Sequence, residues 1–442
     1  MKRSSFKPIK IVAVNLLLLF LFVEAASVGF YYLRTGKFFY STNQGEDKSI
    51  ALPPENDSGD RALNNSISHR LHPYFGFVYD THTTRRLQFS NVNYSANNFG
   101  ILSPYAYPVK KTNNEQYIIG IFGGSVGMYF GFYELENHVL VNALKRLPYF
   151  QNKQIIVLPF ANGAYKQPQQ LLALNYFISL GQEFDMVINI DGFNETALAY
   201  LNNKSGTEIS MPNLEILGPM IDLANRNLAL NELDLTLEIL KLKQELKETS
   251  GNLNKCRMAT CYTLRWMQIE YLLSQYRKKL ETFSGLKRDY KQSDSLVHLD
   301  AHDGPLNDQD ALREMADVWA KSALAMNDLL SKKQIPYFEV IQPNQYYATA
   351  RKFSEAEKKI ALNSSSRYAE GVSKGYPKLI AKIGDLQKSG VKIINAVNAF
   401  DDVRDVLYED DCCHYNKVGN EVFANFIARN IVMLLNTEPA PK

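Results

Sequence analysis

Residues 117–127 of the chain read YIIGIFGGSVG, an apolar run that ends in two glycines followed by Ser125. An unbroken apolar run bounded by turn residues is typical of a strand buried on both faces of a parallel sheet. Gly123 and Gly124 permit a sharp turn, and Gly127 lets a following helix start close to the sheet. The segment therefore predicts a strand, a tight turn and a helix, with the Ser125 hydroxyl at the helix N-terminus.

Four more apolar runs follow, and helical patterns come after most of the five. The predicted strands are 117–122, 155–160, 186–190, 337–341 and 391–395. The predicted helices are 135–147, 168–180, 308–330, 376–386 and 416–435. Alternating strands and helices predict a parallel sheet with helices on both faces, an α/β fold. Such sheets bind their ligands at the carboxyl ends of the strands, where Ser125 and Asn194 both lie.

The segment 206–300 interrupts the α/β pattern. Leucines recur every seven residues from Leu228 to Leu242, and residues 264–283 are helical again. This pattern predicts an antiparallel helical hairpin inserted into the α/β body. Its role is left open between a structural element, a lid and a surface for a protein partner.

The N-terminus has a basic segment followed by a mostly apolar one, residues 11–33. At about 1.5 Å per residue, this segment can cross a hydrocarbon core of roughly 30 Å. The cations that precede it predict a cytoplasmic N-terminus, with the remainder of the chain outside the cytoplasm. A cleaved signal peptide is the alternative, because small residues follow at 25–27. We favour an uncleaved anchor, since apolar and aromatic residues continue to Leu33; either way the rest of the chain is exported.

We therefore expect five segments along the chain. Residues 1–35 form a cytoplasmic tip and a transmembrane anchor, and 36–70 form a polar linker. Residues 71–205 and 301–442 form the two parts of the α/β domain, on either side of the hairpin at 206–300. The formal net charge of +3 is small for 442 residues, so no nucleic-acid partner is indicated.

Four cysteines fit an exported chain. Cys256 and Cys261 are spaced to close a small disulfide loop, whereas the adjacent Cys412 and Cys413 could bridge only with strain. Cross-pairing between the two groups stays open. Neither pair has the usual spacing of a zinc site, so no metal is predicted.

Three motifs carry candidate chemistry. A serine nucleophile needs a base, and that base needs an orienting group. Ser125 is placed where helix N-terminal N–H groups can stabilise an oxyanion, and the Asn194 amide is a suitable further donor. His414 follows Asp411 by three residues, a spacing at which the carboxylate can orient the imidazole. Together these residues predict an acyl-transfer site, although each motif alone also occurs as an ordinary turn or helix cap.

The motifs resemble those of the SGNH (GDSL-type) hydrolase superfamily. The first block resembles FGGS, ending at Ser125, the third resembles GFN, ending at Asn194, and the fifth resembles DCCH, ending at His414. The resemblance covers about residues 71–205 and 301–442. It implies a flavodoxin-like three-layer α/β/α sandwich of about five parallel strands.

The same resemblance implies the roles of individual residues. Ser125 would be the nucleophile, His414 and Asp411 the base and its orienter, and the oxyanion hole would combine Ser125 N–H, a glycine N–H and the Asn194 side chain. Gly163 is the only glycine available in the second block, although the best register can place Ala164 there. The supporting turn glycines are Gly123, Gly124 and Gly192, and Gly124 stands where many members have aspartate.

We therefore predict an exported, membrane-anchored serine esterase without a metal or organic cofactor. Its substrate would be an ester, such as an O-acetyl group, on a cell-envelope glycan or lipid in the bacterial periplasm or at the cell surface. One alternative is an O-acyltransferase that acts on a surface polysaccharide through the same serine. Another is a catalytically silent glycan-binding or assembly protein with the same fold. Secretion after signal-peptide cleavage is the alternative location.

Overall fold

The computed structural model describes residues 7–41, 68–90, 92–224, 230–285, 297–299 and 304–436. The chain divides into two compact units. The smaller unit combines Met1–Leu63 with Arg226–Lys291, and the larger combines Asn64–Asn225 with Gln292–Lys442. Most of the predicted linker, residues 42–67, lies outside the described residues.

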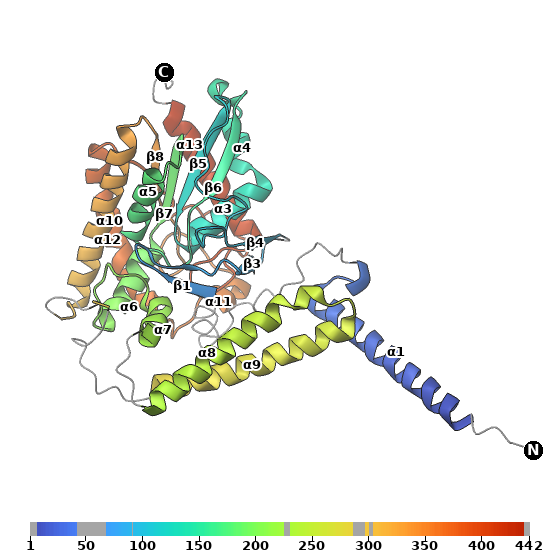
Figure 1. The fold of residues 1–442 in the computed structure, drawn as a ribbon. Coiled ribbons are helices and arrows are strands. Elements are labelled where there is room, and N and C mark those ends of the chain that lie inside the picture. The colour runs from blue at the N-terminus through green and yellow to red at the C-terminus, as the bar shows by residue number, and fades with distance from the viewer. Residues whose placement is uncertain are drawn as a thin grey trace, which may run out of the picture. The chain divides into compact units, whose positions relative to one another are not determined.

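The larger unit is built on a five-stranded parallel sheet, shown in Figure 1. Its strands are β5 (Gln116–Gly123), β6 (Gln154–Pro159), β7 (Met186–Asp191), β8 (Tyr337–Ile341) and β9 (Lys392–Asn395). They are ordered β6-β5-β7-β8-β9 across the sheet. All five predicted strands are present, and every residue of β7 and β8 is buried. Burial on both faces explains why most residues of these strands are apolar, although β7 also buries Asn189 and β8 buries Glu339.

Helices of the larger unit pack in two groups. One group joins α3 and α4 with α13, and the other joins α5 and α12 with α10; the two groups lie on either side of the sheet in Figure 1. The helices are α3 (Ser125–Asn137), α4 (Val139–Leu144), α5 (Gln169–Ser179), α6 (Ala199–Lys204), α7 (Leu214–Ala224), α10 (Asp308–Ser331), α11 (Glu355–Ala361), α12 (Ala369–Lys388) and α13 (Lys417–Asn436).

Two helix predictions need correction. The helix expected at 135–147 is the end of α3 followed by α4, and His138 separates them with a left-handed φ of 54°. The helix expected from residue 376 begins at Ala369 in α12 and has Pro377 in its interior. Helix α7, within the segment expected to be an insertion, belongs to the larger unit and contacts β1 and β2.

Two short antiparallel pairs open the larger unit and were not predicted. Strand β1 (His69–His72) pairs with β2 (Gly76–Tyr79), and β3 (Thr84–Arg86) pairs with β4 (Asn93–Ser95). Strands of three or four residues are too short to show a period in the sequence.

The smaller unit contains α1 (Lys7–Thr35), α8 (Leu230–Gly251) and α9 (Ala259–Gly285). Helix α8 packs on α9, and α9 packs on α1. A disulfide joins Cys256, in the connection before α9, to Cys261 in the first turn of α9, the small loop that the spacing predicted. The carboxylate of Glu24 in α1 accepts the backbone N–H groups of Ala259 and Thr260 at 2.6 and 3.0 Å, so it caps the N-terminus of α9.

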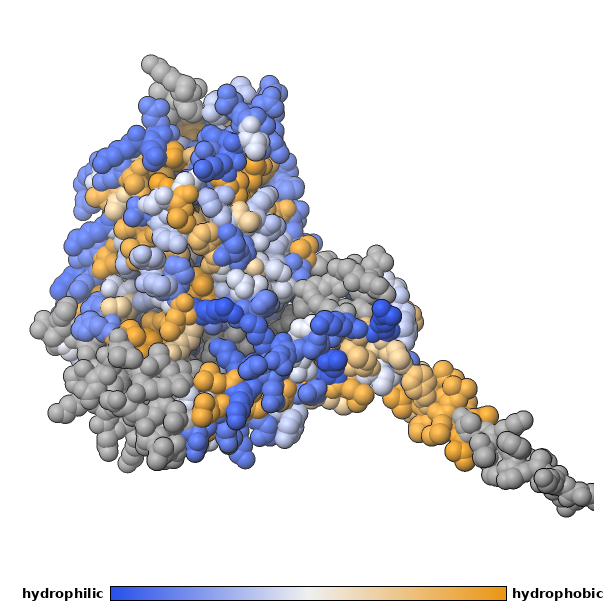
Figure 2. Space-filling model, viewed as in Figure 1, coloured by the Kyte–Doolittle hydropathy of each residue, from blue (hydrophilic) through white to orange (hydrophobic). Residues whose placement is uncertain are grey.

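Helix α1 contains a stretch, Val14–Thr35, that is long and apolar enough to span a membrane. Its leucines at 16–19 are each more than half exposed, and the helix presents an apolar surface in Figure 2. Exposure of leucine side chains to water is unfavourable, whereas their transfer to a hydrocarbon phase is favourable.

Candidate active site

The serine turn has the predicted form. Strand β5 ends at Gly123, and α3 begins at Ser125, whose side chain is partly exposed. Gly123 has a φ of 134°, and a Cβ there would lie 2.4 Å from the carbonyl oxygen of Ile190 in β7. Only glycine fits that position. The turn therefore leaves the hydroxyl at the N-terminus of α3, beside N–H groups that have no intrahelical acceptor.

His414 lies 289 residues after Ser125 in the chain, and its Nε2 is 2.8 Å from the serine Oγ. Its Nδ1 is 2.5 Å from Oδ2 of Asp410. The ring of Tyr129 from α3 stacks on the imidazole, with 4.8 Å between the ring centroids. With the proton on Nδ1, Nε2 is free to accept the serine proton, which is the arrangement that a serine nucleophile requires.

The carboxylate that orients the histidine is Asp410, not the predicted Asp411. Oδ1 of Asp410 accepts the backbone N–H groups of residues 412–414 at 3.0, 3.0 and 3.2 Å, so the carboxylate faces into its own turn. That orientation places Oδ2 beside the ring of His414. Asp411 instead accepts a hydrogen bond from the side chain of Asn363, at 2.9 Å.

His414 and Asp410 each stabilise the charged form of the other. Burial alone would raise the pKa of Asp410, but the charge of His414 and hydrogen bonds from its ring and backbone hold that pKa well below its usual range. Burial alone would lower the pKa of His414, but Cys413 and Asp410 raise it well above its usual range. Burial raises the pKa of the nearby Glu409 to about 7, against the opposing effects of His414 and a hydrogen bond with Tyr129. The negatively charged groups beside the ring therefore stabilise the protonated form of the His414 imidazole.

Asn194 lies against the serine turn. It begins a π-helical turn, Asn194–Leu198, after the two residues that follow β7, and such turns are frequent at functional sites. Its Nδ2 donates to the carbonyl oxygen of Tyr165 at 2.6 Å. A Cβ at Gly124 would lie 2.0 Å from that nitrogen, so the amide occupies the space beside Ser125. An amide nitrogen carries two protons, so one remains for an oxyanion.

The loop after β6 also borders the serine turn. The backbone N–H of Asn162 donates to the carbonyl oxygen of Gly123 at 3.2 Å, and that of Tyr165 donates back to Asn162 at 3.2 Å. Ala164 completes this tight turn with a φ of 61°. Gly163 lies within the turn, so it is close to the site, and its role as an oxyanion donor stays a prediction.

Sequence reasoning assigned no role to Glu195, which follows Asn194. Its buried carboxylate accepts the backbone N–H of Gly192 at 2.7 Å and that of Gln167 at 3.1 Å. It therefore ties the turn after β7 to the loop after β6. Burial lowers the pKa of the neighbouring Lys166 to about 7, although the charge of Glu195 opposes this shift. Glu195 stands between Asn194 and Thr196, both polar, so nothing in the sequence set it apart.

Three side chains after β8 hold the loop that carries Asp410 and His414. Asn344, Gln345 and Tyr346 donate to the carbonyl oxygens of residues 412, 410 and 411 at 3.0, 3.2 and 2.8 Å, respectively. Backbone carbonyl groups on one side of the loop are thus satisfied, while the Asp410 carboxylate satisfies N–H groups on the other side. The loop is fixed independently of any ligand.

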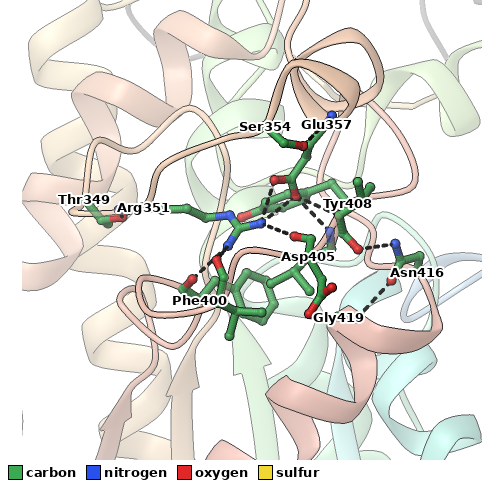
Figure 3. Close-up of polar contacts among 12 residues, drawn as sticks. Thr349, Arg351, Ser354, Glu357, Phe400, Asp405, Tyr408, Asn416 and Gly419 are labelled. Atoms are coloured by element: carbon green, nitrogen blue, oxygen red, sulfur yellow. Dashed lines mark hydrogen bonds and ion pairs between the residues drawn. The ribbon is translucent and has the colours of Figure 1, made fainter.

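A buried ion pair anchors the chain that leads into this loop (Figure 3). The side chain of Arg351 is 4% exposed and that of Glu357 is 0% exposed, and they pair through the guanidinium Nη2 at 2.6 Å. Arg351 also donates to the carbonyl oxygens of residues 400, 403 and 405. Glu357 accepts the backbone N–H of Leu407 at 2.8 Å. Removing either partner would release the segment that precedes Asp410.

Cys412 and Cys413 are both thiols in this structure, and they are not bonded to each other or to the other pair. Their sulfur atoms and a ring nitrogen of His414 lie within 4.8 Å of one another. Both ring nitrogens of His414 are already engaged, one with Asp410 and one with Ser125. A metal ion at this place would displace one of these contacts.

Four segments that are distant in the sequence thus meet at one end of the sheet. Ser125 follows β5, the turn at 162–165 follows β6, Asn194 follows β7, and His414 precedes α13. Parallel strands place such residues together because their carboxyl ends share an edge. Comparison with protein-family models and with curated proteins finds no match for the chain.

Proposed function

We propose that the protein is a serine ester hydrolase with Ser125, His414 and Asp410 as its catalytic triad. The observation that carries this proposal is the hydrogen-bonded chain from Oγ to Nε2, 2.8 Å, and from Nδ1 to Oδ2, 2.5 Å. His414 would take the serine proton as the hydroxyl attacks an ester carbonyl, and Asp410 would stabilise the resulting imidazolium. Water would then release the acyl group from the serine.

The oxyanion of the tetrahedral intermediate would lie between three donors. The first donor is the N–H of Ser125, which is the first residue of α3. The second is the side chain of Asn194, which lies beside Gly124. We assign the third donor to Gly163, in the turn that borders Gly123. Each donor of this kind typically contributes a factor of about 10²–10³ to turnover.

The fold supports an SGNH-type interpretation. In chain order, the strands are arranged 2-1-3-4-5 across the sheet, which is the flavodoxin-like order. We therefore interpret the larger unit as a flavodoxin-like three-layer sandwich, into which α8 and α9 are inserted as a helical hairpin. Gly124 replaces the aspartate that many SGNH enzymes have. Because the Asn194 amide occupies that space, a side chain there would collide with it.

Helix α1 and the disulfide support an exported, anchored enzyme. We propose that α1 spans the cytoplasmic membrane, with the basic N-terminus inside and the α/β unit outside. The Cys256–Cys261 disulfide is consistent with an oxidising compartment. An O-acyl group on a cell-envelope glycan or lipid is the substrate class we propose for that location.

Labelling with a fluorophosphonate probe tests the proposal. The full-length protein in detergent micelles would be exposed to the probe beside Ser125→Ala, His414→Ala and the matched surface variant Ser389→Ala. We expect labelling of the wild type and of Ser389→Ala only. Asn194→Ala should label about 10²–10³-fold more slowly. A folded wild type that resists the probe would contradict the proposal and favour the silent binding protein.

A further inference from the structure

The adjacent thiols of Cys412 and Cys413 lie next to the catalytic base. Their sulfur atoms are 2.9 Å apart, and the two side chains are 7% and 1% exposed. This distance between the sulfur atoms is shorter than a usual hydrogen bond between two thiols. The carbonyl oxygen of Cys412 is held by Asn344, and the N–H groups of both cysteines are held by Asp410. The backbone of both cysteines is thus held by hydrogen bonds, and their two sulfur atoms lie next to each other.

The other two cysteines are oxidised in this structure. Cys256 and Cys261 are joined in a disulfide, and disulfides persist in oxidising compartments outside the cytoplasm. A chain that is exported through α1 meets the same oxidant before it folds, when residues 412 and 413 are still accessible.

We propose that Cys412 and Cys413 form a vicinal disulfide in the exported protein, and that this bond controls whether His414 can act as a base. In the chemical step, the two thiols react with one disulfide of an oxidoreductase or a small molecule. One sulfur–sulfur bond forms within the chain, and the oxidant leaves as two thiols that carry both protons and both electrons. The formation of the bond rests on the export proposed above and not on the esterase activity; its effect on catalysis rests on that activity.

Such a bond would be readily reversible. Adjacent Cα atoms are about 3.8 Å apart across a trans peptide, whereas most disulfides join Cα atoms about 4.4–6.8 Å apart. A strained disulfide is reduced more easily than a relaxed one. The Cys412–Cys413 bond would therefore respond to reductant under conditions that leave Cys256–Cys261 intact.

The consequence for His414 follows from charge. The groups that face its ring are Asp410, Cys413 and Glu409 from its own loop, and Ser125 and Tyr129 from α3. Burial would raise the pKa of the Cys413 thiol, but a hydrogen bond with Cys412 and the charge of His414 lower it to about 7. A thiolate beside the ring stabilises the imidazolium, which cannot accept the serine proton. The disulfide removes that negative charge and leaves Asp410 as the main partner of the ring.

Mass spectrometry tests the bond itself. The full-length protein, exported and purified without reductant, would be unfolded in iodoacetamide with and without prior reduction and then digested with trypsin. We expect the peptide 405–417 to be unalkylated and lighter by two hydrogen atoms before reduction, and doubly alkylated after it. Alkylation of both cysteines without reduction, in a sample whose Cys256–Cys261 bond is intact, would overturn the proposal.

Titration of His414 by NMR tests whether the Cys412–Cys413 bond changes the pKa of this residue. The histidines would be isotope-labelled, and His414→Gln would assign the signal of His414. The measurement does not depend on whether Ser125 reacts. We expect the pKa of His414 to be about 1–3 units lower in the disulfide form than in the dithiol form. Cys412→Ser should hold the higher value in both redox conditions, and Cys256→Ser/Cys261→Ser should keep the response. Equal titration in the two forms would refute the coupling. Absence of fluorophosphonate labelling in both forms would count against the esterase alone.

Discussion

Replacing Asp410 by asparagine should nearly abolish the activation of Ser125 while it preserves the loop. The amide oxygen can still accept the backbone N–H groups of residues 412–414, now at 3.0–3.2 Å from Oδ1. The atom 2.5 Å from Nδ1 of His414 becomes an NH₂ group, which donates where the carboxylate accepted. It favours the tautomer with its proton on Nε2, and that nitrogen cannot accept the proton of Ser125.

The expected loss is about 10⁴-fold in rate, the usual effect of the wrong tautomer in such a triad. This corresponds to about 5.4 kcal/mol in the activation free energy. Asp411→Asn is the matched control, because it removes an equal charge one residue away. Its carboxylate accepts from Asn363 at 2.9 Å, whereas the contact with Nδ1 of His414 is made by Asp410, so we expect a change of less than about threefold.

Rates of fluorophosphonate labelling and of p-nitrophenyl acetate hydrolysis would measure both variants, with melting temperatures as a check on folding. A large loss in Asp411→Asn together with a small loss in Asp410→Asn would refute the assignment of Asp410. Large losses in both would mean that the negative charge of the loop matters more than the contact with Nδ1.

Three further predictions concern the turn, the buried ion pair and acid stability. Gly124→Ala should slow labelling by at least about 100-fold, because its Cβ would lie 2.0 Å from Nδ2 of Asn194; normal labelling by the folded variant would contradict this. Glu357→Ala should lower the unfolding free energy in urea by about 3–5 kcal/mol, because it leaves Arg351 buried without its carboxylate. Arg351→Met/Glu357→Ala should then cost less than the two single changes together, and strict additivity would argue against the pairing. The pKa of Asp410 is depressed in the folded protein, so its charge contributes stability that is complete above about pH 5 and is lost as the pH falls. The difference in unfolding free energy between the wild type and Asp410→Asn should therefore shrink below about pH 4, and a difference independent of pH would contradict it.

The strands of the sheet were predictable because their burial leaves a mark on consecutive residues. Strands β7 and β8 are buried at every position, and most side chains of such strands are apolar on both faces. The carboxyl ends of parallel strands lie at one edge, so Ser125 and Asn194 could be placed together without knowledge of the tertiary contacts. The pairs β1–β2 and β3–β4 left no comparable mark, because each strand is only three or four residues long.

The orienting acid was predicted wrongly because two neighbouring aspartates offer the same chemistry. Asp410 is turned inward by three backbone N–H groups, and Asp411 is drawn to Asn363, 48 residues before it in the chain. The role of Glu195 was missed because its partners belong to two different loops, which only the fold brings together.

The sequence alone thus determined the five strands, the apolar N-terminal helix and the serine turn. Each depends on the burial, length or spacing of residues that are near one another in the chain. Only the tertiary structure decided which carboxylate faces His414 and which side chain fills the space beside Gly124. Those outcomes depend on hydrogen bonds and close contacts between distant segments, and two residues of the same type can be told apart only by the partners that the fold brings to them.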